Sequence, residues 1–307
     1  MASTVPCVAD VPFRYVSSDK DSGRWVDFPF RVGDIVVSTR SKSGTTWMQM
    51  ICALLVFGRP ELPEPLGRLS PWVDHLVESR EALVGRLERQ SWRRILKTHT
   101  PLDGIPLDPR ADYLVVARHP LDMAVSLHHQ GHNIDRQRLA QLTGSSEPIT
   151  RSGTHLSAHD WLMEWVRADD DPRTTMDSLA GVMWHLSDAW GRRDEPNVTL
   201  IHYDDLSADL TGQMRRIAAQ LGITIEDSAW SNLAWAASFE QMRSHAAELI
   251  PNAGGILKDD RAFFRRGRSG AGRELFNDAE MSEYHHRVSV LAAPNLLNWL
   301  HRSVPSP

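Results

Sequence analysis

Short runs of consecutive apolar residues alternate along this chain with longer segments in which apolar residues recur every three or four positions. A strand that is apolar at successive positions is buried on both faces, which is typical of a parallel sheet covered by helices. The runs predict four such strands, at residues 34–38, 94–97, 112–117 and 198–202. The pattern therefore predicts an α/β fold, a single domain with a central parallel sheet flanked by helices.

Helical periodicity is clearest at residues 45–57, where Gly58 and Pro60 end the pattern. Further helices are predicted at 80–90, from Pro120 towards His129, at 182–192, from Ser207 as N-cap to Leu221, at 230–243, and at 278–301 with an interruption at Pro294. The remaining segments are expected to be irregular, and polar residues 131–158 are expected to form a long loop or lid. Nothing divides the chain, so we expect one domain over 1–307, with its core at about 30–277 and a C-terminal helical segment at 278–302.

Composition narrows the function classes. The 307 residues can bury a core without metals or disulfides, and a net charge of −5 does not indicate a nucleic-acid surface. No apolar run is long enough to span a membrane, so membrane insertion is not expected. Cys7 and Cys52 are the two cysteines, which suits a reducing cytoplasm.

A polar residue follows each predicted strand: Lys42, His99, Arg118 and Tyr203. Ligands of parallel sheets bind beyond the carboxyl ends of the strands. These four side chains are therefore expected to meet at one site.

The first strand leads into a short turn and a helix through Lys42-Ser43-Gly44-Thr45-Thr46-Trp47. Such a turn is a phosphate cradle, because amides and the helix dipole favour an anion. The lysine precedes the only glycine, unlike the G-x-x-x-x-G-K-[ST] loop for a triphosphate with magnesium. We therefore expect a P-loop-like loop without a metal; a turn with a surface lysine is the alternative.

Three more motifs favour an anion site. Lys97 and His99 lie two apart on an extended segment and so face the same way, placing a base beside a cation. Arg118 with Ser126 offers a phosphate fork at a helix start. The basic run from Arg265 to Arg273 is either a solvated loop or a clamp that closes over a phosphate.

Together these segments resemble the sulfotransferases that use 3′-phosphoadenosine 5′-phosphosulfate (PAPS). Residues 42–47 resemble the 5′-phosphosulfate loop of that family, 97–99 its catalytic segment, and 116–118 with Ser126 its 3′-phosphate motif. Residues 203–206 and 238–242 resemble its adenine-side segments, and Arg265-Arg266-Gly267 its C-terminal clamp. The matches run in the family's order from residue 34 to about 276.

The resemblance implies a role for each matching residue. His99 would be the general base, Lys42 would stabilise the leaving phosphate, and Lys97 the sulfonyl group. The 5′-phosphate would be held by Thr45 and Thr46 on the turn of Ser43 and Gly44, the 3′-phosphate by Arg118, Ser126, Arg265, Arg266 and Gly267, and adenine by Trp47, Phe239 and Tyr203. The product nucleotide would be 3′-phosphoadenosine 5′-phosphate (PAP).

Some positions depart from the family pattern. Ala237 replaces a usual threonine, Arg266 a lysine, Gly272 a tryptophan and Arg273 a lysine, and the usual dimer segment is not recognisable after Phe276. An oligomer remains open, and residues 131–180, which match nothing specific, are where acceptor selection is expected.

We therefore expect a cytoplasmic enzyme that transfers sulfonate to a hydroxyl, or alternatively an amine, of a small molecule. Two other functions stay open: a non-catalytic protein that binds PAPS or PAP, and a nucleotide-dependent phosphotransferase. The latter would need a magnesium-binding aspartate after a strand, and Arg118 stands in that place.

Overall fold

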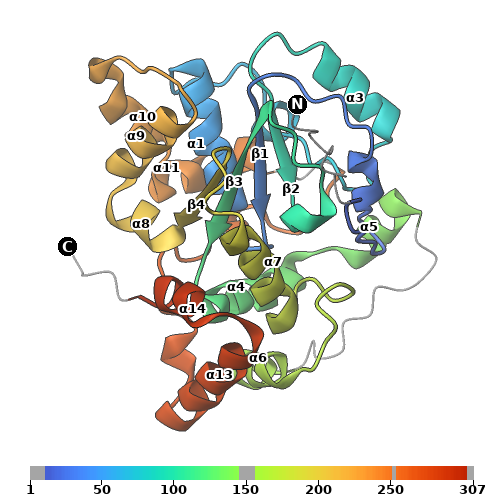
Figure 1. Cartoon of the computed structure of the whole chain (residues 1–307), viewed down its shortest axis with the longest axis vertical. Helices are drawn as coiled ribbons and strands as arrows, with labels where there is room; N and C mark the ends of the chain where they lie inside the picture. The colour runs from blue at the N-terminus through green and yellow to red at the C-terminus, as the bar shows by residue number, and fades with distance from the viewer. Residues whose placement is uncertain (1–10, 145–155, 251–253, 303–307) are drawn as a thin grey trace, which may run out of the picture.

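A four-stranded parallel sheet in the order β2-β1-β3-β4 forms the centre of the molecule (Figure 1). The computed structural model describes residues 11–144, 156–250 and 254–302. The strands are β1 (Asp34–Thr39), β2 (Ile95–Thr98), β3 (Ala111–Ala117) and β4 (Val198–His202). All four predicted strands are confirmed to within one residue, because consecutive buried apolar residues are a strong local signal.

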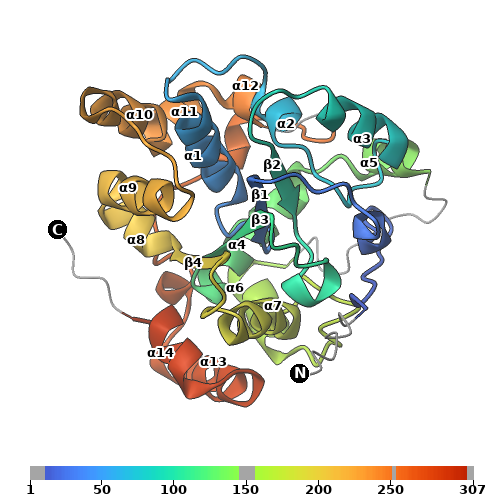
Figure 2. The same cartoon turned by 45° about the horizontal axis from the view of Figure 1, so that its top comes forward.

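The two faces of the sheet bury alternate residues of each strand. Ile35 and Val37 pack with α1 (Thr45–Phe57) in one core cluster, while Val36 packs with α3 (Arg80–Glu88) in another. The α1 face is also covered by α9 (Leu210–Gln220), α10 (Trp230–Ala236), α11 (Phe239–Ser244) and α12 (Ala246–Leu249). Figure 2 shows α1 on one side of the sheet and α7 (Leu179–Gly191) on the other.

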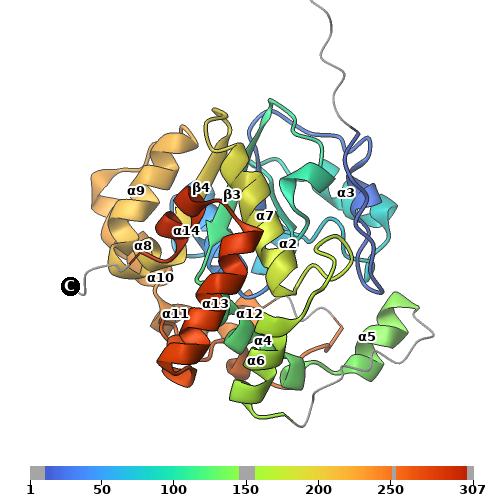
Figure 3. The same cartoon turned by 60° about the horizontal axis from the view of Figure 1, so that its bottom comes forward.

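Helices at the C-terminus add a second layer beyond α7. The helix α13 (Asp278–Leu291) packs against α6 (Ala158–Arg167) and α7, and α14 (Pro294–Leu300) follows it (Figure 3). Pro294 lies in the first turn of α14, where its missing N–H has no helical partner to lose. The predicted interruption at Pro294 is confirmed. None of the helices in the described part of the chain has the length and hydropathy to span a bilayer.

The prediction of an irregular segment at 131–158 is wrong for much of its described part. Helix α4 (Pro120–Asn133) runs past His129, and Asp135 caps a further helix, α5 (Arg136–Thr143). Leu139 is the one buried residue of α5, so the helix has no apolar period for sequence reasoning to detect. Residues 145–155 lie outside the described residues.

Two other helix boundaries differ from prediction. Ser207 is not an N-cap but lies within α8 (Tyr203–Ala208), where its hydroxyl donates to the Tyr203 carbonyl. Asp209 caps α9 instead, accepting from the Gly212 amide. The predicted helix 230–243 is divided into α10 and α11, with Ser238 capping the second, and the proline-rich segment contains a short helix, α2 (Leu66–Leu69).

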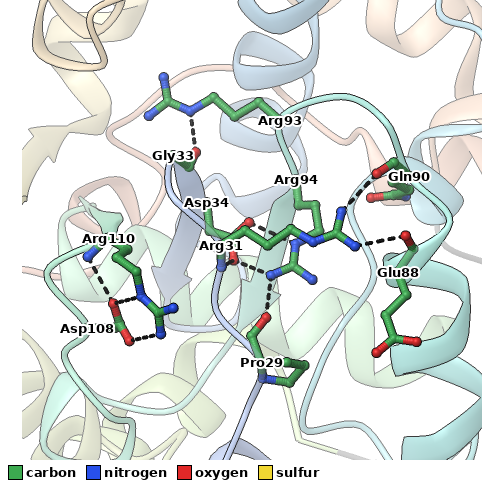
Figure 4. A network of polar contacts seen from close by, with 10 residues as sticks. All are labelled: Pro29, Arg31, Gly33, Asp34, Glu88, Gln90, Arg93, Arg94, Asp108 and Arg110. Atoms are coloured by element: carbon green, nitrogen blue, oxygen red, sulfur yellow. Dashed lines mark hydrogen bonds and ion pairs between the residues drawn. The ribbon is translucent and has the colours of Figure 1, made fainter.

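A buried ion pair joins β1 and β2 at their amino ends, opposite the predicted site (Figure 4). Asp34 begins β1, Arg94 precedes β2, and each side chain is 1% exposed. Arg94 donates from Nε to Asp34 at 2.8 Å and from Nη2 to the Pro29 carbonyl at 2.8 Å. Asp34 also accepts from the Arg31 amide, so both charges are compensated by hydrogen bonds.

Candidate active site

A cavity of about 440 Å³ lies beyond the carboxyl ends of the strands. It brings together nearly all the residues that the sequence singled out: Lys42, Gly44, Thr45, Thr46, Trp47, Lys97, His99, Arg118, Ser126, Tyr203, Phe239, Arg265, Arg266 and Gly267. Ser43 does not line it; this residue is buried, and its amide donates to the Arg40 carbonyl at 3.1 Å. The volume is in the range of cavities that hold small ligands.

The turn between β1 and α1 is tightly wound. Lys42 has a φ of 65° and Gly44 a φ of 102°, both in the left-handed region. The hydroxyls of Thr39 and Thr45 are hydrogen-bonded, which ties the end of β1 to the start of α1. A turn of this kind at a helix N-terminus favours anion binding.

Lys42 lies in this turn without an acidic partner in the described part of the chain. Its Nζ lies 3.8 Å from the centre of the Phe263 ring and 3.4 Å from Oε1 of Gln130. Burial, followed by the charges of Arg118, Lys97 and Arg265, lowers its pKa to about 7. A phosphate would supply the negative charge that this ammonium lacks.

Arg118 and Arg265 add two guanidinium groups to the same cavity. Arg118 is 9% exposed, and it lies 4.3 Å from the centre of the Tyr203 ring. Its Nη1 donates to the Lys42 carbonyl at 3.2 Å. In both arginines Nε is buried and makes no hydrogen bond to a described residue. Buried donors normally have acceptors, so these atoms point to an anionic ligand.

The basic run is held in place by acidic residues. Arg266 donates to both carboxylate oxygens of Glu274, at 2.7 and 2.9 Å. The amides of Gly270 and Gly272 each donate to Asp122 at 2.8 Å. The charge of Arg266 is therefore already compensated.

Two glycines of this run lie where a side chain would not fit. A Cβ on Gly267, whose φ is 65°, would lie 2.3 Å from the Phe239 ring. A Cβ on Gly272 would lie 2.3 Å from Leu121. The close approach at Gly272 gives a physical reason for the departure seen there, because a tryptophan has no room.

His99 is buried and held in one tautomer. Its Nδ1 is hydrogen-bonded to the Thr39 carbonyl. Because a carbonyl can only accept, Nδ1 carries the proton and Nε2 keeps the lone pair. Burial, followed by the nearby charge of Lys97, holds the pKa of His99 well below its usual value. The imidazole is therefore neutral at pH 7 and able to accept a proton at Nε2.

Lys97 lies beside His99 and rests on an aromatic ring. Its Nζ is 4.1 Å from the centre of the Trp72 ring, which stacks on His75 at 4.2 Å and meets His99 edge-on at 4.6 Å. Burial, followed by the charge of Lys20, lowers the pKa of Lys97 to about 7. A cation–π contact holds this ammonium without using a carboxylate.

Other cavity-lining residues were missed by sequence reasoning. Trp72, His75, Asp19, Lys20 and Asp177 line the cavity but come from segments predicted to be irregular or left unassigned. No short sequence motif links these residues to the residues that follow the strands. The aromatic residues Trp72 and His75, three positions apart, are a signal that could have suggested a pocket wall.

One wall of the cavity is apolar. It comprises Leu127, Ile134, Leu139, Met242, Ile250, Ile256, Leu257 and Phe263. Ile134 and Leu257 form a β-bridge, and the Asp135 amide donates to the Ile256 carbonyl at 2.7 Å. The α4–α5 connection and the segment that contains Ile256 and Leu257 therefore form part of this wall together. No group of three or more His, Cys, Asp or Glu residues among those described is arranged to hold a metal ion.

Comparison with known proteins gives consistent matches. The family model of the sulfotransferase domain matches residues 33–293. A glycolipid sulfotransferase of Mycobacterium bovis is 39% identical over 305 residues, covering 94% of this chain and 93% of that protein. Mouse sulfotransferase SULT7A1 complexed with PAP has a similar structure, with a TM-score of 0.67, 20% identity, and coverage of 92% of this chain and 93% of that one. Retinol dehydratase in a complex with retinol and PAP gives a TM-score of 0.68 at 20% identity, covering 92% and 86%.

Proposed function

Because this chain belongs to the sulfotransferase family, we propose that it binds PAPS in this cavity and transfers sulfonate to a hydroxyl of a small molecule. One observation carries the proposal. Lys42, Lys97, Arg118 and Arg265 surround a single cavity without ion pairs to described residues, and a neutral His99 lies among them. A cavity of this kind suits an anionic donor and a reaction that begins with proton removal.

The cavity residues fit the phosphates of the donor. The turn of Lys42, Gly44 and Thr45, at the N-terminus of α1, would hold the 5′-phosphate, with Thr46 as a further donor. The buried Nε atoms of Arg118 and Arg265, with Ser126, would meet the 3′-phosphate.

Aromatic side chains on the same side fit the adenine ring. Trp47 donates from Nε1 to the Ala237 carbonyl at 2.8 Å and meets the Tyr203 ring edge-on at 5.2 Å. Phe239 packs against the backbone of Gly267. We assign Trp47 and Phe239 to the two faces of adenine and Tyr203 to its edge.

When bound, the donor supplies the sulfonate group. Nε2 of His99 takes the proton of the acceptor hydroxyl, and the Thr39 carbonyl stabilises the imidazolium through Nδ1–H. Lys97 and Lys42 line the same cavity. Lys97 would balance charge on the sulfonyl oxygens, and Lys42 would balance charge on the leaving phosphate.

For the acceptor we propose an amphiphile with a hydroxylated head, such as a glycolipid. The relative that is 39% identical is a glycolipid sulfotransferase. The cavity lining supports this choice, because the polar residues Asp19 and Lys20 lie in the same cavity as the apolar wall residues. A hydroxylated head and an alkyl tail would each find a matching surface.

A transfer assay tests the proposed function. Radiolabelled PAPS should give labelled product with a member of a panel of glycolipids, sterols and phenols. Binding of PAP without product from any acceptor would favour the non-catalytic alternative. Magnesium-dependent transfer of a γ-phosphate from ATP would favour the phosphotransferase.

Replacing Arg118 with methionine should remove most of the preference for a 3′-phosphate. The wild type should bind PAP more tightly than 5′-AMP, and loss of a charge-assisted hydrogen bond costs about 1.5–3 kcal/mol. Calorimetry with both nucleotides measures the difference. Arg266→Met is the matched control, because Glu274 already pairs with that guanidinium. If the wild type bound both nucleotides equally, the 3′-phosphate assignment would be wrong.

Nucleotide binding should take up protons above pH 7. In the free enzyme the pKa values of Lys42 and Lys97 are lowered to about 7, so at pH 8 both amines are largely neutral. Bound phosphate favours the ammonium forms and raises both pKa values. At pH 6 the amines are already protonated, and no uptake is expected from them. Calorimetry at pH 8 in buffers of different ionisation enthalpy measures the uptake, and an enthalpy independent of the buffer would contradict it.

A further inference from the structure

Arg40, two residues before Lys42, is an arginine with 1% of its side chain exposed. Its Nη1 donates to the backbone carbonyl of His99, and its Nη2 donates to Oδ1 of Asp177 at 2.6 Å. Arg40 does not line the cavity, so it is outside the donor and acceptor roles proposed above. A buried guanidinium at this place needs another explanation.

Asp177 is anchored by contacts with α6 and by its position at the start of α7. Its carbonyl accepts from Nε1 of Trp165 in α6 at 2.9 Å, and the next residue, Ser178, caps α7. Its Oδ2 accepts from the Ser41 hydroxyl at 3.1 Å. Burial raises the pKa of Asp177, but the charges of Arg40 and Lys20, together with the hydrogen bond from Arg40, outweigh burial and lower that pKa overall, so the carboxylate stays ionised.

His99 is therefore held at two points by consecutive residues. The Thr39 carbonyl holds its ring at Nδ1, and Arg40 holds its backbone carbonyl. These residues lie at the end of β1, immediately before the turn that carries Lys42. The end of β1 thus connects His99, the proposed base, with the turn that carries Lys42. Asp177 links this end of β1 to α6 and α7.

We propose that the Arg40–Asp177 ion pair is a positioning element that sets His99 in its reactive orientation relative to the Lys42 turn. This inference rests on the proposed function, since it assigns His99 as the base. Neither Arg40 nor Asp177 needs to touch the reacting atoms. A displacement of about 1 Å in a catalytic group can cost roughly 10²-fold in rate, so a fixed carbonyl at His99 matters.

The test separates positioning from stability. Arg40→Met should lower kcat by roughly 10²-fold, with the affinity for PAP and the KM for acceptor unchanged. Arg40→Met also leaves the Asp177 carboxylate without its ion-pair partner, and this uncompensated charge should lower Tm. In the double variant Arg40→Met/Asp177→Asn, Tm should recover because no unpaired charge remains, while kcat stays low. Arg40→Lys, which keeps one donor and the charge, should restore part of kcat.

A second buried arginine–aspartate pair, Arg94 and Asp34 at the amino ends of β1 and β2, serves as a control. Because Arg94 and Asp34 lie at the amino ends of β1 and β2, away from His99, Arg94→Met/Asp34→Asn should leave kcat per folded molecule unchanged. A double Arg40/Asp177 variant whose kcat returned to the wild-type value would overturn the proposal.

An independent readout is the NMR signal of the His99 Nδ1 proton, which should exchange faster with solvent in Arg40→Met. An unchanged exchange rate would argue against the proposal even without a turnover assay. A wild type inactive towards every acceptor, with this signal behaving as expected, would count against the proposed function alone.

Discussion

Replacing His99 with alanine is expected to lower kcat by roughly 10²–10⁴-fold and to leave the affinity for PAP unchanged. The reason is the arrangement at the ring. Nδ1 is committed to the Thr39 carbonyl, and Nε2 keeps a lone pair in a cavity where protonation is disfavoured. Alanine removes the proton acceptor but no cation, so donor binding should persist.

Single-turnover kinetics and calorimetry on the same preparation check both parts of this prediction. His75→Phe is the control, because His75 lines the same cavity and phenylalanine keeps its stacking on Trp72. That variant should retain a rate close to the wild type. Near-full activity of His99→Ala at neutral pH would show that another group removes the proton.

Replacing Lys42 with methionine should lower kcat by roughly 10²–10³-fold, the usual effect of losing one group that stabilises transition-state charge. The affinity for PAP should also fall, since the ammonium meets phosphate in the ground state as well. Methionine has a similar length and also carries a Cβ, so the backbone strain at a φ of 65° is unchanged. The substitution therefore isolates the charge.

The control for Lys42→Met is Lys258→Met, at a lysine that precedes the basic run. Lys258 is exposed, donates to the His132 carbonyl and does not itself line the cavity. Rates and nucleotide affinities of both variants can be measured at several salt concentrations. Equal losses in the two variants would mean that Lys42 acts only through general positive charge.

Local sequence signals were reliable where burial on both faces or a tight turn dictates the residues. The four strands follow from consecutive apolar residues, and α1 from its periodicity and from Gly58 at its end. Because the strands are parallel, the residues that follow them had to meet at one edge. This is why Lys42, His99 and Arg118 could be assigned to a common site before the fold was known.

Local sequence signals failed where a helix buries few apolar residues, or where two possible N-cap residues lie close together. Helix α5 buries Leu139 alone, so its sequence resembles a polar loop. Ser207 and Asp209 both have capping side chains, and only the path of the chain after α8 selects Asp209. Neither choice can be made from composition.

By itself, then, the sequence determined the sheet, the turn that carries Lys42 and the polar residues that follow the strands, because each depends on neighbours a few positions away. Tertiary structure alone decided which partners those residues have. Arg40 pairs with Asp177, 137 positions away in the sequence, and Lys97 rests on the Trp72 ring. Asp122 reaches the basic run only because α4 lies beneath it. Contacts of this kind depend on the packing of distant segments, and that packing sets the protonation and orientation of His99 and Lys42.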